Sequence, residues 1–164
     1  MPTTPDWPTI HERTVDIFRT GWESPTPEAW DGFIDAHSQM VQPMLRDGVG
    51  AEFWHGESAR ALQVMPDLHA EVLSWSGVDE QVFIHLRFHA TVGGRPLSWD
   101  AVDLLRLRED GGLIRRDSFF DSAPVARALA TRPGAWWPWW RSGLWPLEGR
   151  RRLFALLSRS RGHR

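Results

Sequence analysis

Two histidines and an arginine alternate along one predicted strand and suggest the first chemistry to consider. Residues 81–91 (QVFIHLRFHAT) place His85, Arg87 and His89 on one face, because successive residues of a strand point to opposite sides. His85 and His89 would lie ~13 Å apart at ~3.3 Å per residue, too far for one metal ion with ~2 Å bonds. We therefore predict no metal site and no cofactor, and expect these histidines on a pocket wall or on the surface.

The sequence leaves open which face of this strand points inward, since the opposite face is fully apolar and could itself pack on helices. If Arg87 and His89 face a cavity, they make it a site for an anion or a carbonyl oxygen. If they face outward, they form with Phe83 and His85 a stripe suited to contact with another protein.

Asp103 lies in the middle of a second predicted strand, on the same face as Trp99, Leu105 and Leu107. If that face is buried, the carboxylate needs a partner, because an unpaired buried charge is very costly. Arg87 on the neighbouring strand is the expected partner. A structural ion pair and a catalytic dyad are both open at this point.

The composition excludes several mechanisms. The chain has no Cys, Lys, Tyr or Asn, so thiolate chemistry, disulfides, zinc–sulfur sites and Schiff-base catalysis are absent. The Gly-Glu-Ser-Ala-Arg run at 56–60 lacks the closing glycine of a nucleophile elbow. Gly48-Val49-Gly50 lacks the third glycine of a dinucleotide site, and His11-Glu12 has no second histidine four residues after the first.

The charge is unevenly distributed along the 164 residues. Residues 1–126 carry twenty acids and ten Arg, and residues 127–164 carry nine Arg and only one acid, Glu148. An acidic body argues against nucleic-acid binding. The first ten residues lack the features of a signal peptide, and the longest apolar runs of the sequence fall far short of the ~18 residues of a membrane span, so a cytoplasmic location is expected.

The length of 164 residues is typical of one domain. Three helices are predicted in the first 65 residues. The first is capped by Thr4 or Thr9. The second follows Thr26-Pro27 and places Trp30, Phe33, Ile34 and His37 on one face; the third covers 51–64 and is interrupted at Gly56. After Pro66 the spacing of apolar residues changes from the 3.6-residue period of a helix to the two-residue period of a strand. Long strands are predicted at 69–75, 81–91, 96–107 and 113–120, with Gly-rich turns at 93–94 and 110–112.

This order predicts an α+β fold in which long antiparallel strands twist and curl around helices. The segments 94–105 (GRPLSWDAVDLL), 110–114 (DGGLI) and 118–121 (SFFD) resemble the closing hairpin of SnoaL-like proteins, of the nuclear transport factor two and ketosteroid isomerase superfamily. The resemblance covers roughly residues 10–130. It implies a cone-shaped α+β barrel with three N-terminal helices packed in a curved antiparallel sheet, a homodimer, and a pocket for an apolar small molecule.

Within that superfamily the missing residues are informative. The isomerases use a Tyr hydroxyl, and the epoxide hydrolases use Tyr and Asn, none of which this chain contains. SnoaL-type cyclases are implied to use an Asp acid/base in an apolar cavity, where desolvation raises a carboxyl pKa toward neutrality. Asp103, Asp117 and Asp121 are the candidates, although Asp121 could instead cap the helix that follows it. The implied ligand-binding residues are Arg87, His89, His85, His37, Trp54, Trp75, Trp99 and Phe119.

The resemblance leaves two functions open: acid/base chemistry on an apolar carbonyl compound, or ligand binding and assembly without turnover. A domain of residues 1–132 is expected to be followed by a Trp- and Arg-rich extension, 133–164. Residues 133–145 (PGAWWPWWRSGLW) hold five Trp, and Pro138 is expected to break any single helix through them. This extension is expected to pack on the body or a second subunit, or to make weak contact with a membrane surface.

Overall fold

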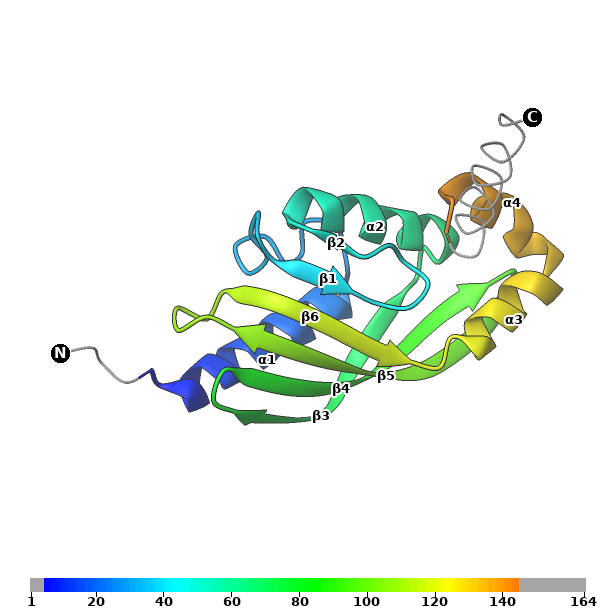
Figure 1. The fold of residues 1–164 in the computed structure, drawn as a ribbon. Helices are drawn as coiled ribbons and strands as arrows, with labels where there is room; N and C mark the ends of the chain where they lie inside the picture. The colour runs from blue at the N-terminus through cyan, green and yellow to red at the C-terminus, as the bar shows by residue number, and fades with distance from the viewer. Residues whose placement is uncertain (1–4, 145–164) are drawn as a thin grey trace, which may run out of the picture.

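A computed structural model describes residues 5–144 of the chain as four helices and one six-stranded sheet. Figure 1 shows the long strands bending together, with α3 and α4 at the end of the sheet away from the N-terminus. In chain order the elements are α1 (Trp7–Glu23), β1 (Gln39–Val41), β2 (Gly48–Val49), α2 (Ala51–Val64), β3 (His69–Val78), β4 (Gln81–Val92), β5 (Arg95–Leu107), β6 (Leu113–Phe120), α3 (Ala123–Thr131) and α4 (Pro133–Ser142).

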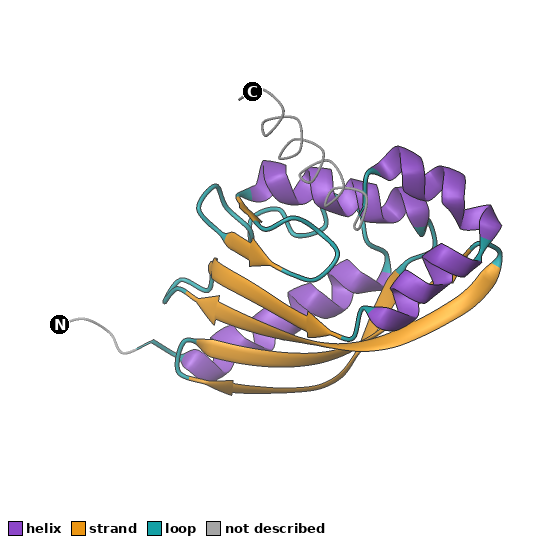
Figure 2. Cartoon of the chain, turned by 45° about the vertical axis from the view of Figure 1, so that its right-hand side comes forward, coloured by secondary structure: helices purple, strands orange, loops and turns teal. Residues whose placement is uncertain are grey.

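The sheet has the strand order β2-β1-β6-β5-β4-β3. β3 to β6 form an antiparallel meander, and β1 joins β6 in parallel. The sheet is strongly curved but does not close on itself, and helices lie over its concave side (Figure 2). The predicted cone-shaped α+β fold is confirmed, with an open sheet.

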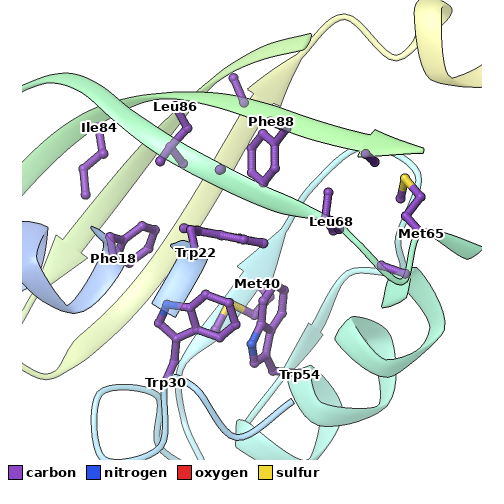
Figure 3. Close-up of a cluster of buried hydrophobic side chains, with 14 of the residues drawn as sticks. Phe18, Trp22, Trp30, Met40, Trp54, Met65, Leu68, Ile84, Leu86 and Phe88 are labelled. Atoms are coloured by element: carbon purple, nitrogen blue, oxygen red, sulfur yellow. The ribbon is translucent and has the colours of Figure 1, made fainter. Parts of the chain in front are cut away.

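The inward face of β4 answers the question that the sequence left open. Val82, Ile84 and Leu86 are fully buried, and Phe88 is nearly so, whereas His85, Arg87 and His89 lie on the outer face. Figure 3 shows the inward residues of β4 facing Phe18 and Trp22 of α1. The apolar face therefore packs on the helices, as hydrophobic burial favours.

The first helix begins one turn earlier than Thr9 would place it. Asp6 is the N-cap residue, and its carboxylate accepts hydrogen bonds from the Thr9 backbone N–H at 3.4 Å and the Thr9 hydroxyl at 2.7 Å. The cap satisfies N–H groups that have no partner within the helix.

The helix predicted after Thr26-Pro27 is wrong. The chain instead makes successive turns, with hydrogen bonds from Asp31 N to Glu28 O and from Phe33 N to Trp30 O. Gly32 adopts a φ of 84°, which interrupts a right-handed helix, and Asp35 accepts the backbone N–H of His37. Trp30, Phe33 and Ile34 are still buried, because two tight turns can direct this spacing of apolar residues inward.

The helical continuity of the Trp-rich segment also differs from expectation. α4 runs through Pro138, which costs the one hydrogen bond that its missing N–H would donate to Gly134. Ala135 and Ser142 are buried against the body. Residues 145–164, which include the rest of the predicted extension, lie outside the described residues. No helix between residues 5 and 144 is long and apolar enough to cross a membrane.

Two glycines within helices provide a matched test of the packing. A Cβ added at Gly21 of α1 would come within 2.6 Å of the Trp30 ring nitrogen, whereas one added at Gly56 of α2 meets nothing within 4 Å. Ala in place of Gly favours a helix by ~0.5–1 kcal/mol, and overpacking a core costs ~1–3 kcal/mol. We expect Gly21→Ala to lower the free energy of unfolding by about 1–2 kcal/mol and Gly56→Ala to raise it by up to about 1 kcal/mol in urea titrations. Equal effects of the two substitutions would contradict the close packing of Trp30 on α1.

Candidate functional site

A cavity of about 80 Å³ opens between the concave face of the sheet, α2 and the loop that follows β1. A chain of neighbouring aromatic rings forms much of its wall, with centroid distances of 4.7 to 5.6 Å from Trp54 through Trp30, Trp22 and Phe88 to Trp99. Figure 3 shows Trp22, Trp30, Trp54 and Phe88 gathered around this space. Aliphatic side chains complete the wall, among them Met44, Leu45, Leu62, Met65, Leu68, Val125 and Leu144.

Four polar residues line the otherwise apolar cavity: Gln42, Ser58, Arg116 and Ser118. Arg116 on β6 is only 5% exposed, which is rare for a charged side chain. Its Nε donates to Asp103 Oδ2 at 2.8 Å, and its Nη1 donates to Gln42 Oε1 at 2.8 Å. Asp103 is fully buried beneath it, so both charges of this pair are withdrawn from water.

The strand register explains this pairing. Asp103 on β5 lies opposite Ser118 on β6, and Arg116 lies opposite Leu105, so the two charged residues are diagonal neighbours on the inner face. On the other side, Asp103 lies opposite the inward Ile84 of β4. Arg87 lies opposite Asp100 instead. The predicted Asp103–Arg87 pair is therefore wrong, because cross-strand neighbours share a face and Arg87 is on the outer one.

The aromatic wall also contacts the arginine. The Arg116 guanidinium carbon lies 5.2 Å from the ring centre of Trp54 and 5.9 Å from that of Trp22. Such cation–π contacts stabilise a desolvated guanidinium by up to ~2 kcal/mol. Arg116 is thus fixed by an anion, an amide oxygen and two rings.

Asp103 Oδ1 and Gln42 Nε2 have no hydrogen-bond partner among the described residues, and neither do the ring nitrogens of Trp22, Trp30 and Trp54. Gln42 must turn its oxygen toward the arginine, which leaves its NH₂ group unpaired. A buried polar atom without a partner costs ~1–3 kcal/mol, so a bound molecule that supplied the missing partners would gain affinity.

The structure brings three of the candidate site residues to this region. Trp54 and Trp99 line the cavity, and Asp103 lies directly behind Arg116. Arg116, Gln42, Ser58 and Ser118 were not anticipated. The alternation of Arg116, Ser118 and Phe120 could have placed the three on one face. Adjacent Arg115 and Arg116 gave no sign of which one points inward.

The remaining candidates on β4 face away from the cavity. Arg87 Nε donates to Asp100 Oδ1 at 2.7 Å, and this hydrogen bond holds the pKa of Asp100 below its ordinary value. His89 lies 3.0 Å from Glu71 Oε1, and His85 lies 3.5 Å from Asp100 Oδ2. These residues make polar contacts across the outer surface rather than a ligand site.

Two carboxylates proposed as acid/base groups have other partners. Asp117 Oδ2 accepts from Arg115 Nε at 2.7 Å on the outer face, since it alternates with the inward Arg116 and Ser118. Asp121 is exposed and accepts the backbone N–H of Ala123 at 2.9 Å, at the start of α3. That contact matches the helix-capping alternative.

The other predicted ligand residues are also solvent-exposed. His37 lies in the turn before β1, and Phe119 lies on the outer sheet face and is 59% exposed. Trp75 pairs with the inward Ile84 and so shares the inner face, but it lies on the edge strand β3, is 40% exposed and does not line the cavity. Phe119 alternates with the inward Ser118 and Phe120, which accounts for its direction. The homodimer stays a prediction, and the outer face of the sheet is where its contact would form; a monomeric mass by light scattering would contradict it.

The titratable side chains do not suggest a metal centre. Between residues 5 and 144, no three His, Asp or Glu side chains converge closely enough to hold a metal ion.

Comparison with known proteins identifies the family. The SnoaL-like domain model matches residues 15–116, more than half of the chain, so this chain belongs to the SnoaL-like family. No curated protein matches the sequence.

Several solved structures share the fold at low sequence identity. A protein from Jannaschia sp. CCS1 that is assigned as a SnoaL-like polyketide cyclase aligns with a TM-score of 0.67 and 19% identity, over 81% of this chain and 99% of its own. A protein with a ketosteroid isomerase-like fold from Catenulispora acidiphila DSM 44928, in complex with trimethylamine, aligns with a TM-score of 0.64 and 19% identity, over 82% of this chain and 98% of its own. TerC, co-crystallised with polyporic acid, aligns with a TM-score of 0.67 and 14% identity, over 74% of this chain and 99% of its own. These likenesses confirm the fold.

Removing one charge of the buried pair should cost far more than removing both. Arg116→Met leaves the Asp103 carboxylate buried without its partner, and Asp103→Leu does the same to the guanidinium, so each single change should lower the free energy of unfolding by ~3–5 kcal/mol. The double variant leaves no buried charge and should lie closer to the parent protein than either single variant. Chemical denaturation of all four proteins measures this cycle. Additive losses would show that the two side chains do not interact.

Proposed function

We propose that this protein binds a small, largely apolar, flat molecule that carries a carbonyl or anionic oxygen, and that Arg116 holds that oxygen. The observation that carries the proposal is a single, almost fully buried guanidinium on the wall of a cavity made mainly of aromatic rings. Apolar walls with a few fixed polar groups are typical of small-molecule sites.

Arginine suits this role because its charge and hydrogen-bonding capacity survive burial. A guanidinium has five N–H groups and stays protonated, and contacts to Asp103 and Gln42 account for two of them. Since Asp103 holds the guanidinium in place before any ligand arrives, little reorganisation is needed when negative charge develops on a bound oxygen.

The volume limits what can enter without movement of the wall. An apolar cavity of ~150 Å³ accepts benzene, and the present cavity of about 80 Å³ is smaller. Met44 and Met65 lie in the wall, and their unbranched side chains can adapt to an occupant. A single-ring compound is therefore the appropriate first probe.

The relatives support a small-molecule function in this fold. TerC was crystallised with polyporic acid, and the Catenulispora protein was crystallised with trimethylamine. The Jannaschia relative is assigned as a polyketide cyclase, a class that acts on carbonyl-bearing chains. That assignment favours, by analogy of fold, a carbonyl compound as the ligand here.

Acetophenone and ethylbenzene form a matched pair of probes, since they share a ring and a two-carbon substituent but only the ketone has an oxygen. We expect the parent protein to bind acetophenone more than about tenfold more tightly, because one hydrogen bond to a charged group contributes ~1.5–3 kcal/mol. The Asp103→Leu/Arg116→Met variant should lose this preference and still bind ethylbenzene. Isothermal titration calorimetry or ligand-observed NMR measures both affinities.

A control variant separates the oxygen contact from the cavity itself. Ala61 lines the cavity, and Ala61→Leu should fill part of it and weaken both probes alike. Equal affinity of the parent protein for the two probes would contradict the role of Arg116.

Proton transfer is the second candidate function, favoured by the unpartnered Oδ1 of Asp103 beside the arginine. In this scheme the carboxylate takes a proton from the carbon next to the carbonyl, the C–H electrons form an enolate, and Arg116 holds its oxygen. Asp103 Oδ2 already accepts a hydrogen bond from Arg116, and the carboxylate lies behind the cavity wall, out of direct reach of a bound molecule. Binding without turnover is therefore the better-supported function.

Exchange of the acetophenone methyl protons in D₂O distinguishes the two functions. A binding protein should leave the exchange at its uncatalysed rate. Exchange by the parent protein that falls more than about a hundredfold in Asp103→Asn would instead establish Asp103 as a base. Arg106→Ala, on the outer surface, serves as the control that should change nothing.

A further inference from the structure

α4 presents three large aromatic side chains to solvent. Trp136, Trp137 and Trp140 are 51%, 68% and 65% exposed, and their spacing of i, i+1 and i+4 places them on one side of the helix. Exposed tryptophans are uncommon and concentrate where a ring can lie partly in an apolar phase and partly in water. Gathered on one helix, they indicate a surface that contacts something.

The opposite side of α4 is held against the body. Ala135 and Ser142 are buried, the Ser142 carbonyl oxygen lies 3.4 Å from Arg60 Nη1 of α2, and the following Leu144 lines the cavity. Figure 1 shows α4 packed beside α2 at one end of the molecule. The direction of the three tryptophans is therefore fixed by tertiary packing.

All the charged residues of α3, α4 and the residues that join them are positive. Residues 123–144 include Arg127, Arg132 and Arg141 and contain no acidic residue. Arg132 donates to the carbonyl oxygens of Val92 and Arg95, whereas neither Arg127 nor Arg141 forms an ion pair with another described residue. By sequence alone, residues 145–164 add six more arginines against the single Glu148.

We propose that α4 is a peripheral docking surface for an anionic lipid membrane. Tryptophan rings favour the depth of lipid headgroups, where the indole is buried and its N–H stays hydrated. Arginines beside them are attracted to anionic headgroups, each strengthening binding roughly fivefold. The positive charge favours a lipid surface over a protein partner. Lipid headgroups are mobile and can neutralise the arginines wherever these lie, whereas a protein partner would need carboxylates at matching fixed positions.

The mode of contact is peripheral. A ten-residue helix is ~15 Å long, about half the hydrocarbon thickness of a bilayer. α4 would therefore lie in the plane of the interface with its tryptophan side down. This inference does not depend on what the cavity holds.

Vesicle co-sedimentation of the full-length protein tests the proposal. We expect binding to phosphatidylcholine vesicles that contain phosphatidylserine, and at least about fivefold weaker binding to pure phosphatidylcholine. Replacing Trp136, Trp137 and Trp140 together by Ser should reduce binding more than about tenfold, because each indole withdraws ~150–250 Å² from water on insertion. Their exposure means that the melting temperature should stay within a few degrees of the parent value.

Two matched controls make the result specific. Trp75→Ser removes an exposed tryptophan from the edge strand β3, outside α4, and should bind vesicles like the parent, provided that light scattering gives the same mass. Arg127→Ala/Arg141→Ala should weaken binding by about 25-fold, whereas Arg106→Ala, 59% exposed on another face, should not.

Three outcomes would overturn the proposal. Undiminished binding by the triple tryptophan variant would assign the contact to another part of the chain. Equal binding to neutral and anionic vesicles would remove the role of lipid charge. If the parent protein does not bind vesicles and its mass falls in the triple variant, α4 is instead a contact between copies of the chain.

Discussion

The ion pair between Asp103 and Arg116 is the constraint on which the interior of this protein depends. Its donor and acceptor atoms lie 2.8 Å apart, and both side chains are withdrawn from water. Placing two charges in a core costs several kcal/mol each before their attraction is counted, so the surrounding groups must compensate. Gln42 and the rings of Trp22 and Trp54 do so. The pair also joins β5 to β6 where the sheet curves around the cavity.

The same arrangement determines the chemistry available to the cavity. A lone carboxylate in an aromatic cavity would have its pKa raised and could exchange protons, as expected from the resemblance to the cyclases. Here Asp103 is hydrogen-bonded to a guanidinium, and the arginine rather than the acid reaches the cavity wall. The site is therefore better suited to hold an oxygen than to move a proton. Membership of the SnoaL-like family fixes the scaffold and leaves this choice to the local residues.

Sequence patterns predicted the fold class, and the strand 113–120 with its observed bounds, because hydrophobic period and glycine turns are local signals. Trp54 and Trp99 were likewise placed near a pocket from residue type. The side of β4 was left open because either the apolar face or the face with His85, Arg87 and His89 could have pointed inward, and only packing against α1 decides between them. Arg116 was missed for a similar reason: of two adjacent arginines one must point inward, and cross-strand register with Asp103, a non-local property, determines which. The turns at 26–37 bury Trp30, Phe33 and Ile34 as a helix would, so the spacing of the apolar residues could not distinguish them, although His37 is exposed.

The carbonyl stretching frequency of bound acetophenone, labelled with ¹³C at the carbonyl, tests the central claim most directly. A ketone that accepts hydrogen bonds from a desolvated guanidinium should absorb at a lower wavenumber than it does in water, and the shift should vanish in the Asp103→Leu/Arg116→Met variant. A bound ketone that absorbs as it does in hexane would show that its oxygen does not meet Arg116, and would contradict the account.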